Sequence, residues 1–95
     1  YWVKTGGEDP VAYVRKYAQR IPLLHIKDRA PKPQDETCPF AEIGHGVLDW
    51  DGIFAAAQGG AIEWYLVEQD RWTRPSLESA GMSIEYLRRR GMTKI

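Results

Sequence analysis

Strand-like apolar runs alternate with amphipathic helical segments along this 95-residue chain. Strands are predicted at residues 1–4 (YWVK), 22–27 (PLLHIK) and 61–69 (AIEWYLVEQ). Helices are predicted at residues 10–19, from Asp49 to the Gly59–Gly60 pair, and from Pro75 to Gly91. Strands that alternate with helices are typical of parallel βαβ units. The sequence therefore predicts an α/β chain of three βα units with parallel strands.

The spacing of apolar side chains assigns a face to two of these elements. In the third predicted strand, Trp64, Leu66 and Glu68 share one side, and Tyr65 and Val67 share the other. The last predicted helix has an apolar face, formed by Leu77, Ala80, Ile84 and Leu87. The segment 28–46, rich in proline and glycine, is predicted to be a long loop, and loops of that length are usually functional.

Composition excludes several classes of partner and compartment. The 13 basic and 13 acidic residues balance, so nucleic acid and anionic membranes are not expected as partners. The sequence has no apolar run near the roughly 20 residues of a membrane-spanning helix, and no signal-peptide pattern at its start. Its single cysteine, Cys38, excludes an intramolecular disulfide and a cysteine-based zinc site. A reducing, cytoplasmic location is therefore expected.

Polar residues gather where two predicted strands end, which is where parallel α/β folds bind ligands. His25, Lys27 and Asp28 lie at the end of the second strand, and Glu68 and Asp70 at the end of the third. An imidazole and a carboxylate at one sheet end suit Zn, Mn, Co or Mg. Structural alternatives stay open: a hydrogen-bonded core histidine for His25, a solvated or ion-paired Glu68, and a surface ion pair of Lys27 with Asp28.

Three motifs in fixed order carry a resemblance to a known superfamily. They are HIKD at 25–28, IGHGVLDW at 43–50 and VEQD at 67–70, followed by a helix with SIEYLRRRG at 83–91. Together they resemble the C-terminal part of sugar phosphate isomerases/epimerases of the xylose isomerase-like TIM-barrel superfamily. The resemblance covers essentially the whole chain and implies that residues 1–95 form a single partial-barrel domain, part of a (β/α)₈ barrel.

The resemblance also implies roles for individual residues. His25 and Glu68 match two of the superfamily's divalent-metal ligands, and Glu68 also matches a catalytic base. Lys27, Asp28 and Trp2 are expected to bind substrate, although several relatives have a histidine at the position of Trp2. The superfamily's other two ligands, an Asp and a Glu, are expected to lie before Tyr1.

Two hypotheses about function follow from this resemblance. In the first, the chain is part of a metal-dependent sugar or sugar phosphate isomerase/epimerase that moves a proton between adjacent carbons, and the isolated chain is inactive and holds no metal. In the second, it is a stable partial barrel with a structural role and no catalysis. A partial barrel has uncovered sheet edges and faces, so self-association as a homodimer or higher oligomer is expected.

Overall fold

The structure is a computed structural model that describes residues 1–31 and 38–93. It divides into two compact units, which we describe separately. The first unit comprises Tyr1–Ile26 and Leu48–Leu66, and the second comprises Lys27–Val47 and Val67–Ile95. Among the described residues, no helix is long and apolar enough to cross a membrane.

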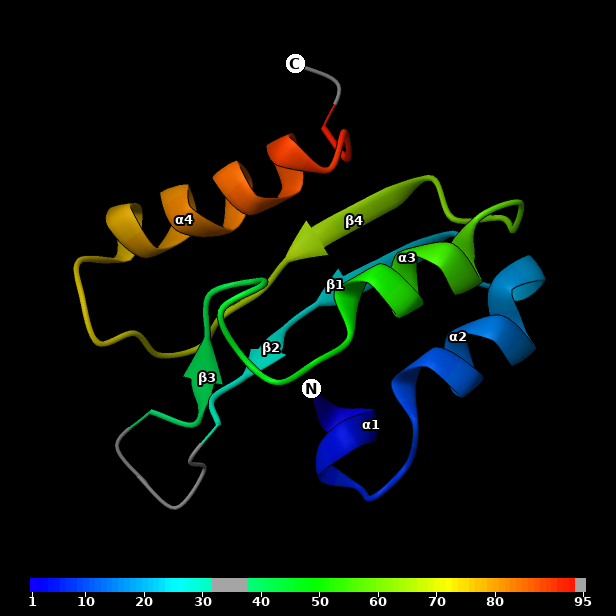
Figure 1. The fold of residues 1–95 in the computed structure, drawn as a ribbon, viewed down its shortest axis with the longest axis horizontal. Coiled ribbons are helices and arrows are strands. Elements are labelled where there is room, and N and C mark those ends of the chain that lie inside the picture. Colours follow the sequence, from blue (N-terminus) through cyan, green and yellow to red (C-terminus); the bar gives the residue numbers. More distant parts are fainter. Residues whose placement is uncertain (32–37, 94–95) are drawn as a thin grey trace. The chain divides into compact units, whose positions relative to one another are not determined.

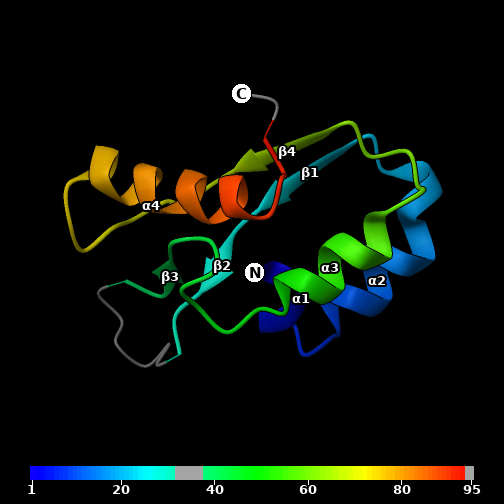
Figure 2. The same ribbon diagram turned by 45° about the horizontal axis from the view of Figure 1, so that its top comes forward.

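The first unit packs helices on one face of a parallel strand pair. Its elements are α1 (Trp2–Thr5), α2 (Pro10–Tyr17), the short 3₁₀ helix η1 (Ala18–Arg20), β1 (Leu23–Ile26), α3 (Trp50–Ala57) and β4 (Trp64–Val67), whose last residue belongs to the second unit. Strands β1 and β4 pair with each other and run parallel (Figure 1). Helices α2 and α3 lie side by side in both views (Figures 1 and 2).

Side-chain caps fix where the two longer helices of this unit begin. The Asp9 carboxylate accepts a hydrogen bond from the backbone N–H of Val11 at 2.9 Å, and Pro10 occupies the first turn, where its missing N–H costs nothing. Asp49 accepts from the N–H of Gly52 at 3.0 Å and begins α3. Both helix starts were predicted from the sequence and are confirmed.

The core of the first unit is apolar. Its buried side chains are Val14, Ala18, Ile26, Trp50, Ile53 and Ala57. Helix α3 covers one face of β4. The Phe54 ring of α3 packs edge-to-face against the Tyr65 ring of β4, with ring centroids 5.2 Å apart. The alternate residues of the strands are open: Leu23, Trp64 and Leu66 are 51%, 57% and 42% exposed. The predicted two-sided alternation of β4 is therefore confirmed.

The second unit combines a short antiparallel strand pair with the last helix. Strand β2 (Asp28–Arg29) pairs with β3 (Phe40–Ala41) in the register Asp28↔Ala41 and Arg29↔Phe40. Helix α4 (Ser76–Arg89) buries Ser79, Ser83 and Leu87. Gly81 lies in the middle of α4, and a Cβ atom there would meet nothing within 4 Å. Such a glycine costs a helix about 1 kcal/mol relative to alanine.

The α/β class and the partial-barrel fold are confirmed, but the predicted strand at residues 1–4 is wrong. The structure has helix α1 there, closed by bonds from the N–H of Thr5 to the carbonyl of Tyr1 and from the N–H of Gly6 to that of Trp2, both 2.9 Å. Four residues are too few for period-2 and period-3.6 patterns to be told apart, so the bulky YWVK run was ambiguous.

Two further expectations need correction. The predicted long loop 28–46 contains the β2–β3 pair. The predicted apolar face of α4 is largely exposed: Leu77 is 86% and Ile84 36% exposed, and Ala80 is also exposed. Only Leu87 of that face is buried, because hydrogen bonds from the neighbouring loop turn Ser79 and Ser83 inward instead.

Candidate functional site

The second unit contains a buried lysine, Lys27, directly after the end of β1. The Lys27 side chain is only 6% exposed. Its Nζ donates to Oδ2 of Asp70 at 2.7 Å and lies 3.7 Å from Oε2 of Glu68. The same nitrogen stands 4.9 Å from the centroid of the Phe40 ring. Lys27, the residue after β1, thus brings its ammonium group to the two carboxylates that follow β4.

Ion pairing with Glu68 and Asp70 explains how the Lys27 ammonium group can be buried. A buried ammonium group is stable only when it is paired and hydrogen-bonded. The Glu68 and Asp70 side chains remain 44% and 50% exposed, so both carboxylates are in contact with solvent. The site thus brings one ammonium group and two carboxylates together.

The next residue, Asp28, organises the following loop. Its side chain is fully buried. Oδ2 accepts from the backbone N–H of Gly44 at 2.9 Å and of Gly46 at 3.1 Å, and Oδ1 accepts from the N–H of Arg29 at 2.8 Å. A Cβ atom on Gly46 would collide with the Asp28 carboxylate and the carbonyl of Arg29, so only glycine fits there. Asp28 thus joins the HIKD motif to the IGHG turn.

Glu42 is a second buried carboxylate of the unit. It accepts from Ser79 Oγ at 2.9 Å and from Arg74 Nε at 3.0 Å. Burial alone would raise its pKa, but hydrogen bonds from its own backbone N–H and from Ser79, with the charge of Arg74, hold the pKa below its ordinary value. Glu42 is therefore an ionised anchor between the loop and α4.

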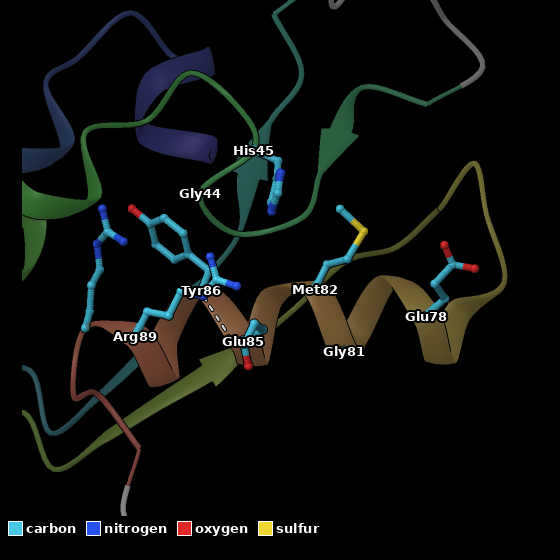
Figure 3. A pocket seen from close by; sticks show the side chains of 9 residues that line it. Gly44, His45, Glu78, Gly81, Met82, Glu85, Tyr86 and Arg89 are labelled. Carbon is cyan, nitrogen blue, oxygen red and sulfur yellow. Dashed lines mark hydrogen bonds and ion pairs between the residues drawn. The ribbon is translucent and has the colours of Figure 1, made fainter.

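The IGHG turn and α4 enclose a partly open groove with a volume of about 530 Å³ (Figure 3). Met82 and Tyr86 supply its apolar part, and His45 from the turn lies across from them (Figure 3). Gly44 has φ of 88°, and a Cβ there would collide with the Tyr86 ring, so the turn and helix approach as closely as glycine allows. The charged rim includes Glu85, which pairs with Arg89 at 2.9 Å.

The structure places the five predicted site residues in different surroundings. Lys27, Asp28 and Glu68 lie in the second unit, where Lys27 and Glu68 meet. His25 is exposed on β1 and Trp2 is 64% exposed on α1, both in the first unit. The metal, substrate and catalytic roles of these residues stay predictions.

The described residues test whether a metal would fit. Across residues 1–31 and 38–93, no three His, Cys, Asp or Glu side chains cluster in a way that could hold a metal ion. The two predicted ligands, His25 and Glu68, therefore do not form a metal site with other side chains of the described part. A metal would need ligands from elsewhere.

Sequence reasoning missed the roles of Asp70 and Glu42. Asp70 was noted only as a polar residue after β4, yet it is the hydrogen-bonded partner of Lys27. The available signal was the VEQD motif itself, in which Glu68 and Asp70 lie on the same side of an extended chain. For Glu42 the sequence held no such signal, since its partners Arg74 and Ser79 are more than 30 residues away.

Comparisons with known proteins find two informative relatives. The chain is 30% identical over 99 residues to an inosose dehydratase of Clostridium botulinum (strain Eklund 17B / Type B), covering 87% of this chain and 33% of the relative. The crystal structure of a sugar phosphate isomerase/epimerase from Parabacteroides distasonis ATCC 8503 matches with a TM-score of 0.71 and 31% identity, covering 92% of this chain and 28% of that one. No protein-family model matches.

The chain is similar to a segment of a sugar isomerase/epimerase. The predicted resemblance to xylose isomerase-like sugar isomerases/epimerases is therefore confirmed. The chain spans about a third of the length of the curated relative that it matches. The group of Lys27, Glu68 and Asp70, which we call the Lys27 cluster, thus lies in a segment similar to part of a sugar isomerase/epimerase. The same holds for the turn at residues 43–46 that Asp28 binds.

Proposed function

We propose that this chain forms part of a sugar or sugar phosphate isomerase/epimerase and supplies Glu68 as a proton-transfer residue. The observation that supports the proposal most is the likeness to the solved sugar phosphate isomerase/epimerase, at 31% identity across 92% of the chain. The Lys27 cluster agrees with it, because it presents a carboxylate at the carboxyl end of a parallel strand.

In this proposal Glu68 acts as a general base. Its carboxylate takes a proton from the carbon beside the sugar carbonyl, and the electron pair of that C–H bond moves toward the carbonyl oxygen. Return of the proton to the former carbonyl carbon, with transfer of the hydroxyl proton of the first carbon to the former carbonyl oxygen, gives the isomer. Return of a proton to the opposite face of the first carbon, with the carbonyl restored, gives the epimer. Lys27, whose Nζ lies 3.7 Å from the Glu68 carboxylate, helps to orient it for the first step.

A divalent metal, Mn, Mg, Co or Zn, belongs to the finer part of the proposal. Bound next to a sugar carbonyl, such an ion would polarise it. Because the described residues contain no cluster of three ligands, ligands from outside them would have to complete the site. We therefore assign no step of the reaction to the metal.

A chimeric enzyme tests the proposal. The matching segment of the solved sugar phosphate isomerase/epimerase is replaced by residues 1–95, and exchange of substrate C–H for C–D in D₂O is followed by NMR with Mn²⁺ present. The chimera is expected to catalyse exchange, and Glu68→Gln is expected to slow it at least about 100-fold, the usual size of a general-base contribution.

The matched control is Glu63→Gln, which changes an exposed carboxylate just before β4. It should leave exchange unchanged. Full activity of the Glu68→Gln chimera would rule out the proposed base. The isolated 95-residue chain is expected to show no exchange, and exchange by it alone would contradict the proposal that the active site needs more chain.

A dehydration is the second candidate activity, because the curated relative is an inosose dehydratase. Loss of water from a sugar ketone also begins when a base removes the proton beside the carbonyl, so Glu68 would have the same first task. The same NMR experiment separates the two reactions. An isomerase or epimerase conserves the substrate's atoms, whereas a dehydratase gives a product that has lost a hydroxyl group.

A purely structural role remains the alternative proposal. The open face of β1 and β4 supports it, since Leu23, Trp64 and Leu66 are all about half exposed there. Under this alternative the chimera folds but shows no exchange, with or without Glu68.

A further inference from the structure

Helix α4 carries an apolar stripe that no described element of the second unit covers. Leu77 is 86% exposed, Ile84 is 36% exposed, and Ala80 between them is also exposed. These residues recur at helical spacing, and about 10 Å separates Leu77 from Ile84 along the axis. A contiguous stripe of this kind marks an association site.

The helix cannot simply roll to bury the stripe, because polar contacts hold its opposite side. The backbone N–H of Ile43 donates to Ser83 Oγ at 3.0 Å, and Ser79 Oγ donates to the buried Glu42 at 2.9 Å. Turning α4 would break both bonds and leave buried polar groups without partners. The exposure of Leu77 and Ile84 is therefore a fixed property of this unit.

Gly81 adds an independent observation. It lies in the middle of α4 beside the stripe, and a Cβ atom there would meet nothing within 4 Å. Among the described residues, no atom lies close enough to require glycine at this exposed position, although glycine weakens a helix. A small residue in a helix face permits the close approach of a second backbone, as it does wherever helices pack tightly.

We propose that α4 is the interface of a homodimer in which a second copy of α4 packs antiparallel along this stripe. With the two-fold axis at the level of Met82 and Ser83, Gly81 lies opposite Ile84 of the second copy and receives its side chain. Leu77 lies opposite the aliphatic stem of Arg88 of the second copy. Every contact occurs twice, as a two-fold interface requires.

Charge complementarity favours a second copy of α4 as the partner and an antiparallel orientation of the two helices. In the same register, Glu78 lies next to Arg88 of the second copy, so each dimer gains two opposite-charge contacts. Within one chain these residues make solvent-exposed pairs, Glu78 with Arg74 at 3.7 Å and Arg88 with Glu85 at 3.4 Å. Exposed pairs of this kind exchange partners at little cost. The zero formal net charge of the chain adds no general repulsion between copies.

Light scattering on the purified chain tests the dimer directly. The wild type, of 10.9 kDa, is expected to show twice that mass at micromolar to millimolar concentration. Ile84→Asp is expected to yield the single-chain mass, because it places a carboxylate opposite Gly81 of the partner. Gly81→Leu is expected to weaken the dimer at least about tenfold by filling the space that receives Ile84.

A charge exchange tests the register. Glu78→Arg and Arg88→Glu are each expected to raise the dissociation constant about tenfold, and the double variant to restore it to within about threefold. Arg15→Glu, a matched reversal on the exposed side of α2, should leave it unchanged. Circular dichroism confirms that each variant keeps its helices.

Two outcomes would overturn the proposal. One is a single-chain mass for the wild type across the whole concentration range. The other is a dimer that survives Ile84→Asp but is lost in Trp64→Thr, which would move the interface to the open face of β1 and β4, as the sequence alone suggested. Failure of the double charge variant to recover, with Ile84→Asp still disruptive, would overturn the antiparallel register.

Discussion

The two units of this chain differ in the polar groups that they bury. The first buries an apolar layer, with Ile26, Trp50 and Ile53 between its helices and its strand pair. The second also buries apolar side chains, such as Phe40, Ile43 and Leu87, but the buried charged and polar side chains of the described residues all lie in it: Lys27, Asp28, Glu42, Ser79 and Ser83. Apolar packing tolerates changes of shape, whereas a buried polar group depends on one geometry. The unit that carries the strand-end carboxylates is thus the one whose positions are set by hydrogen bonds.

The largest predicted effect is at Asp28. Asp28→Ala should lower the free energy of unfolding by about 4 kcal/mol, because it removes the acceptor of three backbone N–H groups around a fully buried site. Urea unfolding measures the loss, and amide hydrogen exchange should accelerate at Gly44 and Gly46. Asp51→Ala, at an exposed carboxylate of α3, is the control. A loss below about 1 kcal/mol would show that the turn does not depend on this carboxylate.

A cavity in the first unit should cost somewhat less. Ile53 is 3% exposed, and Ile53→Ala is expected to lower the free energy of unfolding by about 3 kcal/mol. Amide exchange should increase in α3 much more than in the turn at residues 43–46. Equal acceleration in both places would mean that the two units unfold together, with one shared free energy of unfolding.

A single polar contact in the second unit gives a smaller effect. Ser83→Ala removes the acceptor for the N–H of Ile43 and should cost about 1 kcal/mol. Urea unfolding measures it, with Ser76→Ala at the exposed start of α4 as the matched control. If both variants lose the same amount, the buried serine contributes only helix propensity.

The pH dependence at Glu42 should be the smallest effect. Because the pKa of folded Glu42 lies below its ordinary value, its ionised form stabilises the fold at neutral pH. That contribution is lost as the pH falls through the folded pKa. Glu42→Gln is therefore expected to be less stable than the wild type at pH 7, and the gap is expected to be smaller at pH 3. A gap of the same size at both pH values would contradict an ionised Glu42.

Local signals predicted the first unit better than the second. The caps Asp9 and Asp49 and the alternation of β4 depend on neighbours within a few residues, and all three were predictable. The buried side of α4 was not, because it is set by bonds from Ile43 and Glu42, about 40 residues earlier in the chain. The apolar periodicity of α4 is real, but it marks an exposed stripe.

The candidate site was predictable as a location but not as a set of contacts. The sequence placed Lys27, Asp28 and Glu68 at strand ends and left a Lys27–Asp28 ion pair open. In the structure Lys27 pairs with Asp70 and Glu68, while Asp28 bonds to backbone N–H groups. Adjacent residues of an extended chain point to opposite sides, so Lys27 and Asp28 face different partners.

The buried carboxylate of Asp28 makes two separate motifs a single unit for protein engineering. The HIKD sequence supplies the acceptor, and the IGHG turn supplies the donors and the glycines that let them approach. Neither half is useful without the other: a grafted turn would leave its amides unsatisfied, and a grafted aspartate would be a buried unpaired charge. Any attempt to transplant this loop into another α/β scaffold must therefore carry both segments, although they lie 15 or more residues apart in sequence.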